Sequence, residues 1–145
     1  MKSKWYKPVI FLMLVPLWFL ACSTSKNTDK KSDFAALKTQ EWTVCRLDTI
    51  RTALPDIHFR FSEEGKITGF TSCNRFSGTC TIKKQHITIG PISHTKMLCH
   101  ETRQIENTFL QMLHLCSRWQ LQNKQLLLMN DKKDTLMICN PRRQN

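Results

Sequence analysis

Cysteine is the residue type that offers this chain the most chemistry. The 145 residues include seven cysteines, and the stretch TSCNRFSGTC, residues 71–80, holds two of them, Cys73 and Cys80. Two thiols could serve redox chemistry, but six residues separate them, which is not the spacing of a thioredoxin-type CxxC site. The pattern therefore supports a redox role only weakly.

A second group of residues has the soft side chains that bind copper or zinc. The candidate ligands are His94, Met97, Cys99, His100, His114 and Cys116. Their spacing matches no recognised ligand pattern, and Met97 and Met112 fit core positions better than ligand positions. We therefore predict no metal site and no cofactor, and we keep copper or zinc binding as the alternative hypothesis.

The sequence lacks the patterns that mark common enzyme sites. It contains no nucleophile elbow and no phosphate-binding glycine loop, and its four glycines are dispersed. Cys99 and His100 are adjacent, but adjacent side chains on extended or helical backbone point apart. We predict a protein without catalytic activity.

The amino terminus predicts export. A basic start, MKSKWYK, is followed by an apolar run from Val9 to Ala21 that ends at Cys22. This run is shorter than the roughly 20 residues of a membrane-spanning helix, and Pro16 interrupts it. Residues 1–21 are therefore expected to form a lipoprotein signal peptide.

The residues before Cys22 resemble a bacterial lipobox, in which cleavage occurs ahead of a cysteine that carries diacylglycerol. Lipoboxes usually have leucine three residues before the cysteine and a small residue two before it, where this chain has Phe19 and Leu20. A signal without lipid and an uncleaved anchor are the alternatives. We expect a lipid on Cys22 to hold the protein at a membrane. Ser23 resembles the pattern that sends lipoproteins to the outer membrane, where this protein would face the periplasm.

The chain is basic, with a formal net charge of +11. Removal of the signal peptide would take away Lys2, Lys4 and Lys7 and lower that charge to +8. The remaining Lys and Arg residues are scattered or form short pairs at predicted turns and termini, so solvation explains them better than a nucleic-acid surface. We predict no nucleic-acid partner.

One folded domain is expected at residues 38–140, a length that suits a small domain. Residues 22–37 should form a lipidated amino terminus and a flexible linker, because STSKNTDKKS at residues 23–32 is polar and contains no apolar residue for a core. Residues 141–145 are predicted to be a basic tail.

Short alternating segments dominate the predicted domain. In one of them Ile57, Phe59 and Phe61 alternate with polar residues, and Gly65 should supply the unusual backbone angle of the following hairpin turn. Similar patterns predict further strands around residues 42–44, 66–72, 76–83, 86–89, 119–121, 126–129 and 135–138.

One segment breaks this period of two. From Glu101 to His114 the apolar residues follow helical spacing, which predicts an amphipathic helix that docks on the sheet. The predicted fold is α+β and mainly β: a small curled antiparallel sheet or barrel, with one amphipathic helix inserted before the last strands.

Three segments together resemble a known family. They are SCNRFSG at residues 72–78, ITIGPIS at 87–93 and TKMLC at 95–99, with Glu106, Phe109 and Leu110 following. This combination is similar to the META domain family, which includes the bacterial heat-shock lipoprotein HslJ, and the similarity extends from Trp42 to Ile138. The family motif residues in this chain are Cys73, Asn74, Arg75, Phe76, Ser77, Gly78, Thr95, Met97 and Cys99. The resemblance implies a small envelope domain with an HslJ-like fold and no established enzymatic activity.

The chain departs from the family pattern at Ser72, where glycine is common, and in having four further cysteines. Within the motif, Asn74 tolerates left-handed backbone and suits the bend. Phe76 should begin an alternation that faces inward. Arg75 has either a solvated surface role or a functional contact.

The resemblance also implies a disulfide between Cys73 and Cys99, because both lie at the ends of family-like motifs; two buried free thiols are the alternative. The candidates for further disulfides are Cys45, Cys139, Cys80 and Cys116. Cys45 and Cys139 would be neighbours if the sheet closes on itself, and Cys80 would then remain with Cys116 unless it is simply a core residue.

Together these features predict a non-catalytic, membrane-anchored envelope lipoprotein. Its META-type domain would act in envelope or heat-stress tolerance or as a binding module. The partners would be the membrane, through the lipid anchor, and an envelope protein or small ligand that the sequence does not identify. The oligomeric state is not indicated by the sequence.

Overall fold

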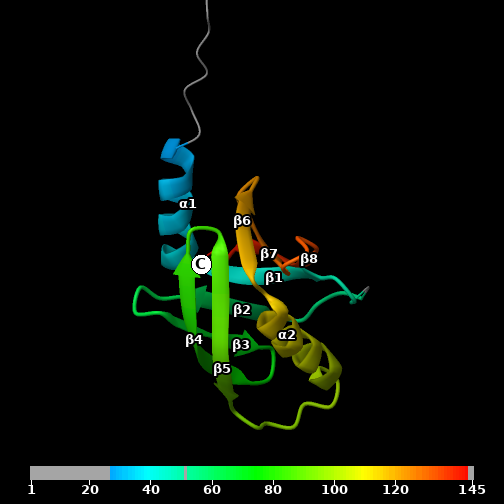
Figure 1. Ribbon diagram of the computed structural model, residues 1–145. Helices are drawn as coiled ribbons and strands as arrows, with labels where there is room; N and C mark the ends of the chain where they lie inside the picture. Colours follow the sequence, from blue (N-terminus) through cyan, green and yellow to red (C-terminus); the bar gives the residue numbers. More distant parts are fainter. Residues whose placement is uncertain (1–26, 51, 144–145) are drawn as a thin grey trace, which may run out of the picture.

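Eight strands and two helices make up the part of the chain that the computed structural model describes, residues 27–50 and 52–143 (Figure 1). The elements are α1 (Asn27–Thr39), β1 (Glu41–Leu47), β2 (Ile57–Phe61), β3 (Lys66–Thr71), β4 (Arg75–Lys83), β5 (His86–His94), α2 (Arg103–Leu115), β6 (Arg118–Gln122), β7 (Gln125–Met129) and β8 (Thr135–Pro141). The predicted signal peptide and Cys22, the predicted site of lipidation, lie outside the described residues.

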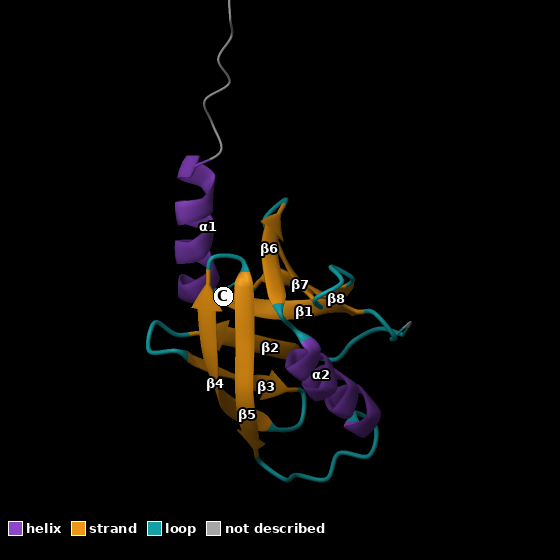
Figure 2. Ribbon diagram, in the orientation of Figure 1, coloured by secondary structure: helices purple, strands orange, loops and turns teal. Residues whose placement is uncertain are grey.

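The strands form one curled antiparallel sheet, as predicted (Figure 2). Each strand pairs with the next along the chain, and β1 also pairs with β8, so the sheet closes on itself. The junction between β5 and β6 is the weakest, with the single residue pair His86 and Arg118. Helix α2 is the connection between these two strands, as the sequence predicts, and it begins two residues later than Glu101.

Alternation along the strands fills the interior of this closed sheet. In β2 the side chains of Ile57, Phe59 and Phe61 are buried while those between them are more exposed. Helix α2 contributes Phe109, whose ring lies 6.2 Å from that of Phe59 and 5.5 Å from that of Phe76. Burial of these aromatic rings together, with Met112 and Leu113 of the same helix, packs α2 against the sheet.

The first hairpin has the turn chemistry that the sequence predicts. Gly65 has φ +73°, a conformation that favours glycine, and its amide donates to the carbonyl of Ser62 over 3.2 Å. The prediction that Gly65 supplies the unusual angle is confirmed.

The predicted flexible linker is wrong for residues 27–37, which are helical. Helix α1 turns Phe34 and Leu37, three residues apart, toward the sheet, and Leu37 is fully buried. The Trp42 indole donates to the Leu37 carbonyl over 3.1 Å, and the Phe34 ring lies 6.3 Å from that of Trp119. These contacts with two tryptophans fix the carboxyl-terminal half of α1 on the sheet. The polar residues before Phe34 continue that helix toward its amino terminus, because adding residues to an existing helix costs less than starting one.

The predicted basic tail is also wrong at its first two residues. Strand β8 continues to Pro141, and the Arg142 amide donates to the Glu41 carbonyl over 2.7 Å. In the described part of the chain, no helix is both long and apolar enough to cross a bilayer.

Candidate functional site

The turn between β3 and β4 is the corner at which the TSCNRFSG segment folds. The Thr71 amide donates to the Asn74 carbonyl over 2.8 Å, and the Asn74 amide donates to the Thr71 hydroxyl over 3.0 Å. Ser72, not Asn74, has the left-handed backbone of this corner, with φ +71°. The sequence therefore indicated the bend correctly and the strained residue incorrectly.

A buried carboxylate lies directly behind this corner. Glu106 comes from α2 and is only 6% exposed. Its two oxygens accept hydrogen bonds from the Thr71 hydroxyl at 2.5 Å and from the Asn74 side-chain amide at 3.0 Å. Burying a charge is unfavourable unless hydrogen bonds compensate it, so these two donors explain how Glu106 is accommodated.

The Asn74 side chain connects this carboxylate to the loop that follows β5. Its oxygen accepts from the Thr95 hydroxyl at 2.7 Å and from the Met97 amide at 2.8 Å, and its nitrogen also donates to the Met97 carbonyl over 3.3 Å. A single asparagine thus bonds the corner, α2 and the loop together, and its hydrogen-bonding groups are all used.

A disulfide fixes the same loop at its other end. Cys73 and Cys99 are bonded, with Cα atoms 6.1 Å apart, as the family resemblance implies. The loop between β5 and α2 is therefore held by a covalent bond at Cys99 and by hydrogen bonds at Thr95 and Met97.

The side chains at the tip of this loop point to solvent. Met97 is 65% exposed and Leu98 is 80% exposed, so the predicted core position of Met97 is wrong, although Met112 is buried as predicted. Isolated exposed apolar residues are common, but two neighbours on a loop that is fixed at both ends form a preorganised apolar tip.

Most of the charged residues near this tip along the chain or across the β4–β5 pairing are cationic. The exposed residues near it in sequence or across the β4–β5 pairing include Arg75, Lys96 and Arg103, against one exposed acid, Glu101. The backbone of Arg75 is fixed on Thr95, whose hydroxyl accepts from its amide at 3.1 Å, while its side chain is exposed. We refer to residues 95–99 together with Arg75 and Arg103 as the motif loop surface.

A model of the META domain matches residues 35–142, most of the chain. The chain belongs to the META domain family.

Solved structures share the fold of this META domain. The NMR structure of a protein from Burkholderia xenovorans has 26% sequence identity, covers 76% of this chain and 88% of that one, and has a TM-score of 0.61. A second protein solved by NMR has 22% identity, with coverage of 74% and 92% and a TM-score of 0.57. The crystal structure of a DUF4847 family protein from Bacteroides vulgatus has 16% identity, coverage of 77% and 98%, and a TM-score of 0.58. At these identities the last two show a likeness of fold alone. No curated protein matches the chain.

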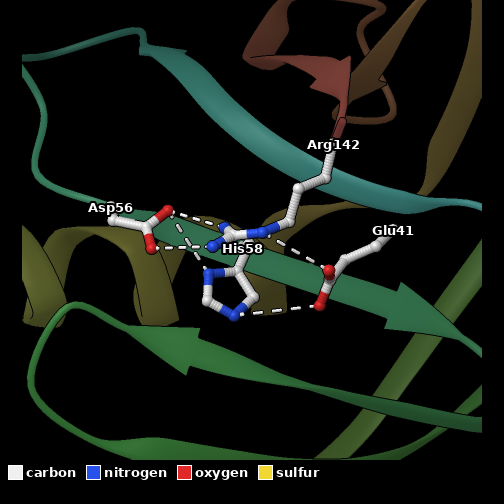
Figure 3. A network of polar contacts seen from close by, with 4 residues as sticks. All are labelled: Glu41, Asp56, His58 and Arg142. Atoms are coloured by element: carbon white, nitrogen blue, oxygen red, sulfur yellow. Dashed lines mark hydrogen bonds and ion pairs between the residues drawn. The ribbon is translucent and has the colours of Figure 1, made fainter. Parts of the chain in front are cut away.

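A second polar cluster of the META domain lies on the outer side of β1 and β2 (Figure 3). Arg142 donates to both oxygens of Asp56, at 2.7 and 3.0 Å, and its Nε lies 3.4 Å from Glu41. His58 Nδ1 lies 3.4 Å from the same Asp56 and its Nε2 lies 3.8 Å from Glu41. The hydrogen bonds from Arg142 lower the pKa of the Asp56 carboxyl below its ordinary value, and those to Asp56 raise the pKa of Arg142. Each acid of this cluster is partly exposed and has a cationic partner. Since Arg142 follows β8 and Asp56 precedes β2, their hydrogen bonds hold the end of β8 beside the start of β2.

The four other described cysteines of the META domain are free thiols, so the further disulfides considered from the sequence are not formed. Cys80, Cys116 and Cys139 are buried, and burial raises the pKa of Cys116 to about 12 and that of Cys139 well above its ordinary value. Cys45 is exposed, and its thiol donates to the Ile138 carbonyl over 3.1 Å. Closure of the sheet does bring β1 and β8 together, but Val44 and not Cys45 pairs with Cys139. A high pKa leaves the buried thiols protonated, so they serve as small core residues.

The metal ligands considered from the sequence are not brought together. Cys99 is in the disulfide and has no free thiolate. His100 precedes α2, whereas His114 and Cys116 lie at its carboxyl end, and the helix between them is roughly 20 Å long. Among the described residues, no group of three or more His, Cys, Asp or Glu is arranged to bind a metal ion.

Sequence reasoning missed the role of Glu106 and of Thr71 in this site. The signal was present, because Glu106 falls on the same helical face as Phe109 and Leu113, three and seven residues later. A charged residue in an apolar stripe predicts a buried polar partner, and Thr71 and Asn74 are those partners.

Proposed function

We propose that this protein is a lipid-anchored protein of the bacterial cell envelope whose META domain acts without catalysis as a binding module, in envelope or heat-stress tolerance. The observation that carries the proposal is the motif loop surface: rigid backbone beneath, exposed Met97 and Leu98 above. Asn74 and Glu106 are fully occupied with one another and with the loop, so they support the loop and are not available for chemistry.

Export is supported by two features that do not depend on each other. A disulfide persists mainly in oxidising compartments, which fits Cys73–Cys99 in an envelope protein. The amino-terminal sequence resembles a lipoprotein signal that ends before Cys22.

The proposed partner is an envelope protein with an apolar hollow bordered by acidic side chains. Met97 and Leu98 would enter the hollow, and Arg75, Lys96 and Arg103 would face its acidic border. A fixed loop loses little conformational entropy on binding, so even a small contact of this kind can be specific.

Mass spectrometry of the mature protein, purified from envelopes without reduction, tests the anchor. We expect an amino terminus at Cys22 that carries lipid, and a mass that includes one disulfide. An unmodified amino terminus at another residue would overturn the lipoprotein proposal.

Site-specific photo-cross-linking in intact cells tests the binding surface. A photoreactive residue in place of Leu98 should give a discrete cross-linked species, and one in place of Thr88, exposed on β5, should not. Adding Met97→Asp should abolish the species while the thermal unfolding of the protein stays unchanged, because the Met97 side chain is exposed. The same species from both positions, or a species that is insensitive to Met97→Asp, would refute the proposed surface.

A further inference from the structure

A cavity of about 650 Å³ lies between α1, the turn that joins β4 to β5, and β6. Figure 1 shows α1 and β6 extending from the same side of the sheet, with that turn between them. The cavity is remote from the motif loop surface, which lies at the other end of β4 and β5 (Figure 1). Its volume is within the range of small-ligand sites, about 300 to 1,000 Å³.

The inner wall of this cavity is apolar and fixed in place. It is formed mainly by Phe34, Trp119 and Leu121. The Trp119 indole donates to the Lys84 carbonyl over 2.9 Å, so the polar group of this largely buried side chain is satisfied and the ring lines the cavity with apolar atoms. The Phe34 ring packs against Trp119, so the wall continues from the sheet onto α1.

The outer edge of the cavity is cationic. Lys30 and Lys31 come from α1 and Lys84 comes from the β4–β5 turn; all three are exposed, and none is in an ion pair with another described residue. Asp33 is the acid among the lining residues, which leaves a formal charge of +2 at the cavity. An apolar wall with a cationic edge is complementary to a molecule with an apolar body and an anionic head.

The position of α1 indicates where such a molecule would come from. Helix α1 begins at Asn27, at the end of the helix that points away from the sheet (Figure 1). If Cys22 carries the lipid, the five residue steps between it and Asn27 span at most ~17 Å. Lys30 and Lys31 follow within the first turns of α1, so the anchor would keep the cavity next to the bilayer surface.

We propose that this cavity binds an acidic phospholipid of the bilayer that holds the anchor, with the acyl region against Phe34 and Trp119 and the phosphate beside Lys30, Lys31 and Lys84. The location at the bilayer rests on the proposed lipid anchor; the complementarity of the cavity does not. Tethering at Cys22 raises the effective concentration of such lipids, so modest intrinsic affinity is sufficient.

Vesicle binding tests this proposal separately from the anchor. The chain from residue 22 onward is made with Cys22→Ser, so that no acyl group contributes. It is mixed with vesicles of phosphatidylethanolamine that contain either phosphatidylglycerol or phosphatidylcholine. We expect sedimentation with the phosphatidylglycerol vesicles only, and a loss of binding at high salt. Equal binding to both vesicles, or to neither, would overturn the proposal whatever mass spectrometry reports of Cys22.

Paired lysine variants distinguish the cavity from general electrostatic attraction. Lys30→Gln with Lys31→Gln should weaken vesicle binding roughly 25-fold, from about fivefold per lysine near an acidic surface. Lys132→Gln with Lys133→Gln removes the same charge from the exposed β7–β8 turn and should have little effect. Equal losses from the two pairs would refute the cavity.

Fluorescence quenching reports the apolar wall directly. The chain from residue 22 onward has two tryptophans, Trp42 and Trp119. Both are buried, at 1% and 4% exposed, but of the two only Trp119 lines this cavity. Phosphatidylglycerol with brominated acyl chains should quench Trp119 emission, and Trp42 should remain as a constant background. Binding without quenching would mean adsorption by charge alone and would refute the cavity. Quenching by free brominated dodecanoate together with no binding to vesicles would refute the bilayer as the source.

Discussion

Replacing Ser72 with glycine should stabilise this META domain. Ser72 has φ +71°, in the left-handed region that side chains other than glycine and asparagine rarely adopt. Its hydroxyl is buried and has no hydrogen-bond partner in the described structure. Two separate costs therefore fall on one residue, and glycine removes both.

The magnitude follows from three contributions. Relief of the left-handed backbone gains about 1 kcal/mol, and removal of the buried unpaired hydroxyl gains about 1 to 2 kcal/mol. The greater freedom of glycine in the unfolded chain costs about 0.5 to 1 kcal/mol. The net gain is about 1 to 2.5 kcal/mol, which corresponds to a rise in Tm of roughly 4 to 10 °C for a domain of this size.

Thermal and urea unfolding, followed by circular dichroism without reductant, measure this gain. Ser72→Ala separates the two costs, because alanine removes the hydroxyl and keeps the strained backbone; it should give a smaller gain than glycine. Ser77→Gly is the matched control, since Ser77 is an exposed strand residue without positive φ, and glycine there should destabilise by about 0.5 to 1 kcal/mol. A Ser72→Gly variant with unchanged or lower Tm would refute the account of this corner.

Three further changes test the parts that hold the site together. Glu106→Gln should lower the free energy of unfolding in urea by about 2 to 3 kcal/mol. Thr71 and Asn74 each donate to one oxygen of Glu106, so the NH2 group of glutamine would face one of these two donors. Removing the bridge with Cys73→Ser and Cys99→Ser should cost about 3.5 kcal/mol in the chain-entropy model and speed hydrogen exchange of the loop amides. Arg142→Gln should cost less than about 1 kcal/mol at neutral pH, because Asp56 is about half exposed. The pKa of Asp56 is lower in the folded protein than its ordinary value of 3.8, so this contribution is present above that pH and should vanish as acid protonates the carboxyl.

Exposed neighbours of the same type serve as controls for these changes. Glu101→Gln and Arg143→Gln remove charges that are exposed and should change the free energy of unfolding by less than about 0.5 kcal/mol. A loss at Glu101 that equals the loss at Glu106 would contradict the buried network. A cost of Arg142→Gln that persists unchanged at acid pH would contradict the ion pair with Asp56.

The strands could be predicted from the sequence because their signal is local. Ile57, Phe59 and Phe61 alternate with polar residues, and alternation of this kind has one structural explanation, a strand with one buried face. Helix α2 is similar, since Phe109, Met112 and Leu113 follow helical spacing and are buried. For these elements the residue pattern and the tertiary contacts agree.

Helix α1 and the exposure of Met97 could not be predicted because they depend on distant partners. The helical state of residues 27–33 follows from Leu37 and Phe34 packing on Trp42 and Trp119, and nothing in the polar residues themselves indicates it. The residue type of Met97 predicts a core position, but the Asn74 side chain bonds both backbone groups of Met97, and the Met97 side chain faces solvent.

The exposure of Met97 separates support from recognition within the family motif. Asn74, Cys73, Cys99 and Thr95 have packing or bonding partners that account fully for their presence. The fold does not explain the Met97 side chain in this way. Only the backbone amide and carbonyl of Met97 are bonded by Asn74, and any residue other than proline would provide both groups. An exposed apolar side chain at a motif position, without a structural need for it, supports the contact with a partner that we propose above. Leu98 is at a position that the motif leaves open, so it would adjust that contact in this chain.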